Sequence, residues 1–159
     1  MTYKKLDPSK INYLIIHHTA TPLWSTYDFV RQIGVSRGFG DISYNFLITA
    51  DGFVHKGRPI DSVPAHCVAD GMNYKSLGIA LTGDFTRVSP TKEQLISLED
   101  TIITLMAKYN VPKENVLGHW EVKGASTLCP GKIKEYVVKF REESLREKLI
   151  RLIQKLIKK

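Results

Sequence analysis

Two short apolar runs constrain the fold of this chain more than any other feature. Residues 12–16 and 76–82 are mainly apolar, with few charged or polar interruptions. Continuous runs of this kind are typical of strands that are covered on both faces of a sheet. The chain has 159 residues, enough for one domain with a substantial core. We therefore expect a single α/β domain in which α-helices flank a central mixed β-sheet.

The other predicted elements fit this fold class. Strands at residues 44–50 and 53–56 are joined by Asp51-Gly52, a strong signal for a tight hairpin, and a short strand is predicted at residues 116–118. Helical periodicity predicts helices at residues 25–37, 89–109 and from residue 133 to the C-terminus. Ser25 or Thr26 is the expected N-cap of the first helix, and Ser89, followed by proline, that of the second.

The C-terminal segment is strongly basic. We divide the chain into a catalytic domain at residues 1–140 and a basic amphipathic C-terminal helix at residues 141–159. Residues 139–159 carry eight lysines and arginines against three glutamates, within a net charge of +7 for the whole chain. Two interpretations remain open: the helix packs its apolar side on the body, or it binds an anionic membrane or lipopolysaccharide.

Cysteine content and the N-terminus give an expectation about the compartment. Cys67 and Cys129 are too few for a disulfide framework, and we expect both to be reduced. The apolar run at residues 13–16 is too short for the core of a signal peptide, and no stretch reaches the length of a membrane span. We therefore expect the protein to be synthesised in the cytoplasm. Its net positive charge suits an acidic partner, for which wall polymers, nucleic acid and anionic lipid all qualify.

Three residues are candidate metal ligands. His17 ends the first predicted strand, His119 follows a short apolar run, and Cys129 precedes Pro-Gly. Two imidazoles and a thiolate suit zinc, and three protein ligands leave a fourth position open for water. Taken one by one, such residues are more often an edge histidine or a small buried thiol. Their spacing matches no compact zinc motif, so the residues alone leave both interpretations open.

Nine motifs occur in an order that matches a known family. The chain resembles the zinc-dependent N-acetylmuramoyl-L-alanine amidases of the phage lysozyme type, which share a fold with the peptidoglycan recognition proteins. The resemblance covers roughly residues 11–140. The motifs are Ile-Ile-His17-His18-Thr-Ala, Asp41-Ile-Ser-Tyr44-Asn45-Phe46, Ala50-Asp51-Gly52, Gly57-Arg58-Pro59, Ala65-His66, Asn73-Tyr-Lys-Ser76-Leu-Gly78-Ile, Gly83-Asp84-Phe85, Gly118-His119 and Thr127-Leu-Cys129-Pro130-Gly131.

The resemblance implies a zinc cleft at one face of the sheet and roles for particular residues. His17, His119 and Cys129 would bind one Zn²⁺ per chain. Tyr44 would handle the proton and the oxyanion of amide hydrolysis. Thr127 is assigned a catalytic role where some relatives carry a lysine, and it brings a hydrogen-bond donor without charge. 

Further residues are assigned around this cleft. The resemblance implies substrate binding by His66 and Asn73, with His66 across the cleft from the ligands. Strand alternation sends His18 to the opposite face from His17. Glu121 and Asp84 are both candidates to orient a ligand imidazole, and the sequence does not choose between them.

The function implied is hydrolysis of the amide bond between N-acetylmuramic acid and L-alanine in peptidoglycan. We expect a monomeric phage-type endolysin that acts on the cell wall after release. Two alternatives remain: a cytoplasmic amidase that recycles muropeptides, and a recognition module that binds peptidoglycan without cleaving it. In the second case the cysteine ligand is typically replaced, so Cys129 argues against it. No nucleic-acid partner is expected, because the chain lacks a pattern of interleaved basic and stacking aromatic residues.

Overall fold

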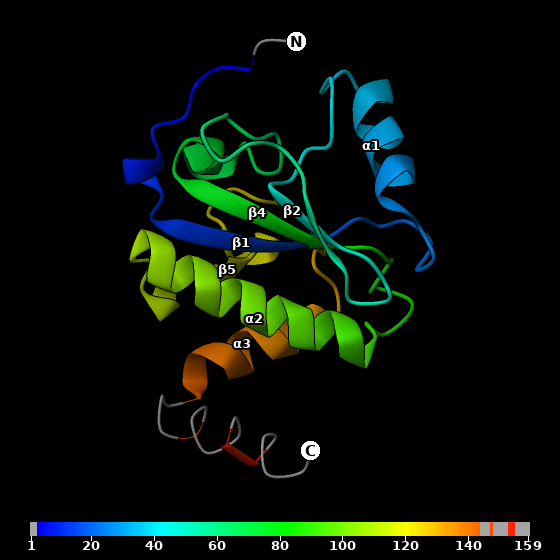
Figure 1. The fold of residues 1–159 in the computed structure, drawn as a ribbon, viewed down its shortest axis with the longest axis vertical. Coiled ribbons are helices and arrows are strands. Elements are labelled where there is room, and N and C mark those ends of the chain that lie inside the picture. The colour runs from blue at the N-terminus through cyan, green and yellow to red at the C-terminus, as the bar shows by residue number, and fades with distance from the viewer. Residues whose placement is uncertain (1–2, 144–146, 148–152, 155–159) are drawn as a thin grey trace.

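A five-stranded mixed sheet forms the centre of the molecule (Figure 1). The computed structural model describes residues 3–143, 147 and 153–154. The strand order is β3-β2-β4-β1-β5; β2 and β3 form the antiparallel hairpin predicted at Asp51-Gly52, and the other neighbours are parallel. The predicted fold class is thus confirmed. The strands are β1 (Tyr13–His18), β2 (Phe46–Ile48), β3 (Val54–Lys56), β4 (Ser76–Leu81) and β5 (Val116–Gly118).

Helices cover both faces of this sheet. In Figure 1, α2 and α3 lie on one side of the strands and α1 lies on the other. Short 3-10 turns link the main elements. The helices are α1 (Tyr27–Ser36), α2 (Lys92–Tyr109) and α3 (Ile133–Glu142), and the 3-10 turns are η1 (Pro8–Lys10), η2 (Ala69–Tyr74), η3 (Lys113–Asn115) and η4 (His119–Glu121).

Alternation along β1 divides its side chains between two environments. Leu14 and Ile16 join the main core, which also contains buried residues of α2 and α3, whereas Ile15 packs in a separate cluster on the other face. β1 runs two residues beyond the predicted strand, because His17 and His18 continue its pairing with β4. The strand therefore carries His17 to its carboxyl end on the face opposite α2.

The helix caps follow local side-chain chemistry. Thr26 caps α1 as predicted, accepting a hydrogen bond from the amide of Phe29. The predicted cap of α2, Ser89, is wrong, because Thr91 takes that position. Thr91 accepts from the amide of Gln94, whose side chain accepts from the amide of Thr91 in return. This capping box satisfies two amides that a helix leaves unpaired at its first turn.

The helix predicted from residue 133 onward is interrupted after α3, and residues 147, 153 and 154 are again helical. Helix α3 begins at Ile133 as expected but ends at Glu142, because Glu143 has extended backbone angles (φ −65°, ψ 124°). Most of the predicted C-terminal helix at residues 141–159 lies outside the described residues, so that helix and the division at residue 140 stay predictions. Among the helices that the structure describes, none is long and apolar enough to cross a membrane.

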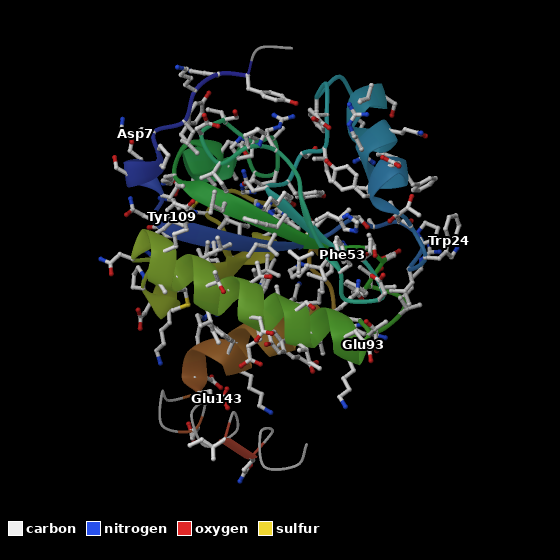
Figure 2. The ribbon with its side chains drawn as sticks, viewed as in Figure 1. Asp7, Trp24, Phe53, Glu93, Tyr109 and Glu143 are labelled. Carbon is white, nitrogen blue, oxygen red and sulfur yellow. The ribbon has the colours of Figure 1, made fainter. Side chains whose placement is uncertain are left out.

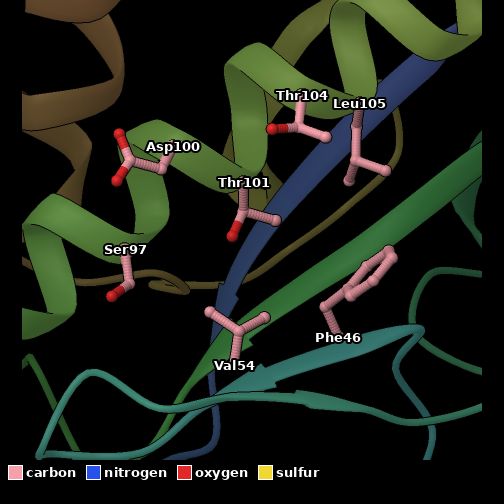
Figure 3. A pocket seen from close by; sticks show the side chains of 7 residues that line it. All are labelled: Phe46, Val54, Ser97, Asp100, Thr101, Thr104 and Leu105. Carbon is pink, nitrogen blue, oxygen red and sulfur yellow. The ribbon is translucent and has the colours of Figure 1, made fainter.

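A hollow of about 310 Å³ lies between α2 and the β2–β3 hairpin (Figure 3). Phe46 and Val54 form its sheet side, and α2 contributes residues such as Asp100 and Thr104. Because it lies on the α2 side of the sheet, this hollow is separate from the environment of His17.

Candidate metal centre

The fold places His17 near the carboxyl end of an inner strand of the sheet. β1 lies between β4 and β5, and His17 pairs in register with Ala80 of β4. Its side chain is only 2% exposed. Burial, followed by the neighbouring His66 and His119, holds the pKa of His17 well below its ordinary value, so its imidazole is neutral. A neutral imidazole is the form that binds a metal.

Backbone hydrogen bonds bring His119 and Cys129 to the same place. β5 ends at Gly118, and His119 opens the 3-10 turn η4. The next amide, that of Trp120, donates to the carbonyl of Cys129 at 3.0 Å, which ties the two segments together. Gly131 has φ 65° and lies so close to the backbone of Phe85 that a Cβ atom would be 2.4 Å from its carbonyl carbon. Glycine is therefore required at position 131, where the loop that carries Cys129 passes the backbone of Phe85.

The three side chains form a cluster that fits a metal ion. Donor atoms of His17, His119 and Cys129 all lie within 4.8 Å of one another. The Nδ1 atom of His17 is 3.6 Å from the Sγ atom of Cys129. Zinc bonds of about 2.0–2.1 Å to nitrogen and about 2.3 Å to sulfur would put two tetrahedral donors about 3.5 Å apart. Both the spacing and the nitrogen and sulfur donors fit zinc.

The environment of Cys129 controls its charge. Burial raises the pKa of the Cys129 thiol to about 12, opposed by the amide of His18, which donates to its sulfur at 3.4 Å. The thiol is thus protonated without a metal and must lose its proton when it binds one. Thr127 accepts a hydrogen bond from the amide of Cys129 at 3.1 Å, which holds the loop in place.

A chain of hydrogen bonds determines which nitrogen of His17 faces the metal. The Ser76 hydroxyl donates to the carbonyl of Met72 at 2.7 Å, so its oxygen accepts from Nε2 of His66 at 3.4 Å. Burial, followed by His119, lowers the pKa of His66 to about 3, so His66 is neutral and its Nδ1 carries no proton. This Nδ1 accepts from Nε2 of His17 at 3.0 Å. The Nδ1 lone pair of His17 is then free, on the side of Cys129.

His66 is held against His17 by buried neighbours. The side-chain oxygen of Asn73 accepts from the amides of His66 and Cys67 at 3.1 and 2.9 Å. A Cβ atom at Gly78 would lie 2.6 Å from the His66 ring, so this glycine makes room for the imidazole. His66 thus lies directly beside His17 rather than across a cleft from it, and Asn73 positions it. Substrate contact by His66 and Asn73 stays a prediction.

Tyr44 lies next to the candidate ligands. Its ring centroid is 5.3 Å from that of His17, and the side chain is half-buried. Burial, followed by the nearby Cys129, raises the pKa of Tyr44 far above its ordinary value. The hydroxyl therefore keeps its proton at neutral pH and can act as a hydrogen-bond donor, on a ring that lies beside His17.

Comparison with known proteins identifies the family. A family model described as N-acetylmuramoyl-L-alanine amidase matches residues 7–132. The chain belongs to this family. It is 32% identical over 139 residues to the human N-acetylmuramoyl-L-alanine amidase and 36% identical over 129 residues to Drosophila melanogaster peptidoglycan-recognition protein LB. These matches cover 80% and 75% of the chain but only 23% and 54% of the two relatives, so the chain spans a quarter to a half of their length.

Solved structures of similar size share the fold. The N-acetylmuramoyl-L-alanine amidase LysC from Clostridium intestinale URNW matches with a TM-score of 0.75 at 30% identity, covering 89% of this chain and 91% of that one. The Ph2119 endolysin from the Thermus scotoductus MAT2119 bacteriophage matches with a TM-score of 0.74 at 26% identity, covering 87% and 89%. This member of the amidase family therefore has relatives among amidases, endolysins and recognition proteins.

In this amidase-family chain, the side chains of the other residues considered near the cluster, His18, Asp84 and Glu121, contact groups other than the candidate metal ligands. His18 points away from the cluster, and its Nδ1 accepts from the amide of Phe85 at 3.0 Å, with Asp84 3.9 Å away. Glu121 accepts from the amide of Gly118 at 2.8 Å and pairs with Arg141 of α3. Both candidate carboxylates are thus engaged away from the ligand imidazoles, and Glu121 instead ties the end of β5 to α3.

Two residues that contact His66, Ser76 and Gly78, were not predicted as site residues. Both lie on β4, where small residues at 76, 78 and 80 alternate with Leu77, Ile79 and Leu81. This alternation of small and large residues could have indicated a site, because the small side chains leave room for a bulky group on one face of the strand. The identity of that group, His66, depends on a loop whose course has no periodic pattern.

The hydrogen-bond chain predicts that Ser76 influences metal affinity. We expect Ser76→Ala to weaken zinc binding about tenfold, because partners of a ligand imidazole fix its tautomer and orientation. Ser36→Ala is the matched control: this exposed serine also donates to a backbone carbonyl, that of Ile33. Zinc dissociation constants from competition with a chelator would measure both. Equal constants for Ser76→Ala and wild type would contradict the proposed tautomer chain.

Glu121 is expected to contribute to stability. Glu121→Ala leaves the Arg141 guanidinium and the Gly118 amide without their carboxylate partner, in a partly buried setting. We expect the free energy of unfolding to fall by about 1–3 kcal/mol. Urea unfolding in the presence of a chelator separates this effect from zinc binding, and Glu114→Ala, at an exposed glutamate of η3, is the control. Equal losses in the two variants would contradict the assignment.

Proposed function

We propose that this protein is a zinc-dependent N-acetylmuramoyl-L-alanine amidase that cleaves the bond between N-acetylmuramic acid and L-alanine in peptidoglycan. The observation that carries the proposal is the convergence of His17, His119 and Cys129 beside Tyr44. Membership of the amidase family supports it. The alternative, a recognition module without activity, is disfavoured because such proteins typically lack the cysteine ligand.

Different residues of the chain would bind the metal, stabilise the oxyanion and transfer the proton. His17, His119 and Cys129 would hold the zinc ion, which supplies a Lewis acid and an activated water at neutral pH. The Tyr44 hydroxyl would donate a hydrogen bond to the oxyanion of the substrate and pass on to the leaving amine the proton that the activated water gives up. Thr127 accepts from the Cys129 amide, an arrangement that leaves its own hydrogen able to point toward the substrate.

The test is the product of digestion. Purified peptidoglycan treated with the full chain and zinc should gain new N-terminal alanine without new reducing sugar ends, since an amide rather than a glycosidic bond is cut. Metal analysis of the same sample should give one zinc per chain. Bound zinc without cleavage of polymer or soluble muropeptides would favour the recognition module, and protein that binds no zinc would contradict the metal site.

We propose a phage-type endolysin role, in which the protein is made in the cytoplasm, is monomeric, and acts on the wall polymer after release. The match to most of the length of a bacteriophage endolysin and of the amidase LysC supports this role. Comparing cleavage rates on intact wall and on soluble muropeptides distinguishes it from muropeptide recycling. A strong preference for soluble fragments would contradict it.

The basic C-terminal segment is proposed to contact anionic membrane or lipopolysaccharide. The proposal rests on its charge and apolar stripe in the sequence. Removing residues 144–159 is expected to reduce lysis of intact cells and binding to anionic vesicles, while the rate on purified peptidoglycan stays within about twofold, because the ligands lie elsewhere. Unchanged vesicle binding and unchanged action on cells would contradict this role.

A further inference from the structure

Large aromatic side chains are exposed beside the hairpin turn, away from the metal cluster itself. Trp24 is 69% exposed and Phe53 is 62% exposed. Figure 2 shows Trp24 projecting from the surface, with Phe53 on the same side of the molecule. Exposed aromatic side chains gathered in one region are uncommon in monomeric proteins and indicate a binding surface.

These rings adjoin a hollow of about 340 Å³, which we call the aromatic hollow. Its lining includes Trp24, Ser25, Tyr27, Thr49, Asp51 and His55. Ring contacts stiffen its walls: Tyr27 stacks on His55 with centroids 5.3 Å apart, and Phe53 meets the edge of His55 at 4.7 Å. Trp24 is supported by Phe29 at 5.8 Å. Ordered rings bind a ligand at a low cost in conformational entropy.

The polar groups of the aromatic hollow select the class of ligand. Thr49 donates to the Asp51 carboxylate at 2.7 Å, so hydroxyl and carboxylate oxygens lie beside the rings. The Ser25 side chain is 1% exposed, and its oxygen has no hydrogen-bond partner among the described residues. Such an unpaired group is destabilising until a ligand satisfies it. No lysine or arginine is among the described residues that line the hollow, which disfavours phosphates and other anions.

A sugar ring has the matching chemistry. Its axial C–H groups form an apolar face that can cover an indole or phenol ring, while its hydroxyl groups need hydrogen-bond partners at the edge. A lipid chain would leave the Ser25 hydroxyl without a partner and would put apolar surface against the Asp51 carboxylate, and an anionic head group would be repelled by that carboxylate. The aromatic hollow therefore fits a neutral amphipathic carbohydrate better than a membrane.

The position of the aromatic hollow connects it to the candidate metal centre. Tyr27 packs on the same buried cluster as Tyr44, whose ring lies beside His17. Trp24 follows His18 by six residues, so the two Cα atoms are at most about 20 Å apart. A few linked sugar rings bridge such a distance.

We propose that the aromatic hollow is a subsite for the glycan strand of the substrate, binding a sugar ring beyond the one attached to the scissile amide. This proposal rests on the proposed amidase function and adds a reason for preferring polymer to small fragments. Binding energy from a remote part of the substrate then contributes to the reaction at the metal centre. Trp24 would be the main contact, because a large exposed ring contributes most when it becomes covered.

The first experiment measures glycan binding without catalysis. Peptide-free glycan strands are added to the full chain, and the indole N–H signals of Trp24 and Trp120 are followed by NMR. The Trp24 signal should shift and that of Trp120, which is packed against the core, should stay. An unmoved Trp24 signal, or a shift caused by anionic phospholipid vesicles and not by glycan, would overturn the proposal. This readout stands even if the protein proves not to be an amidase.

The second experiment compares two substrates in matched variants. For Trp24→Ala, the ratio of kcat/KM on wall polymer to that on a muramoyl peptide without flanking sugars should fall about tenfold. Trp24→Phe should restore most of the ratio, and Phe39→Ala, an exposed aromatic outside the hollow, should keep the wild-type ratio. Equal ratios in Trp24→Ala and wild type would overturn the subsite. Absence of cleavage of both substrates by the wild type would instead contradict the amidase function.

Discussion

Cys129→Ser is expected to remove both zinc and activity from the protein. The substitution leaves two imidazoles and a hydroxyl, and a hydroxyl keeps its proton at neutral pH, unlike a thiol whose proton a metal displaces. We expect less than one zinc per chain after dialysis and a fall of kcat/KM on peptidoglycan by at least about a thousandfold. Metal analysis and release of N-terminal alanine, measured on the same preparation, would test this.

Cys67→Ser is the matched control for this substitution. Cys67 is also a buried thiol, 2% exposed, but it lies outside the cluster of candidate ligands. Its replacement should reduce stability, because it puts a hydroxyl among apolar neighbours, and should leave the zinc content at one per chain. Stoichiometric zinc in Cys129→Ser, or its loss in Cys67→Ser alone, would show that the ligand set is wrong.

The fold was largely predictable because its central strands are simple in sequence. The apolar runs at residues 12–16 and 76–82 became β1 and β4, and the Asp51-Gly52 hairpin followed from local turn chemistry. The cap of α2 was harder to predict. Ser89 and Thr91 both precede the helix, and the choice of Thr91 depends on its reciprocal hydrogen bonds with Gln94.

The candidate site was harder to predict from the sequence than the fold. His17 and Cys129 are 112 residues apart in the chain, and neither has a local motif that would join them, so their pairing came from resemblance to a family. The hydrogen-bond partners of the imidazoles were not predicted, for a physical reason. Whether Glu121 contacts an imidazole or Arg141 depends on where α3 packs, and the contact of His66 with His17 depends on an irregular loop.

Tyr44→Phe should separate catalysis from metal binding. The substitution removes only the hydroxyl, and the phenyl ring can keep its place beside His17. Since a single donor to an oxyanion contributes about a hundredfold to a thousandfold in kcat, we expect kcat to fall by that factor while zinc stays at one per chain. The raised pKa of Tyr44 supports this assignment, because the group remains a donor throughout the neutral range.

The control for this variant is Tyr109→Phe, at the end of α2 and away from the ligand cluster, for which wild-type kcat is expected. If Tyr44→Phe instead raised KM and left kcat unchanged, the hydroxyl would bind the substrate equally in ground and transition states. A kcat within threefold of wild type, with zinc bound, would remove Tyr44 from the reaction. The oxyanion donor would then be sought at Thr127, whose hydroxyl adjoins the Cys129 amide.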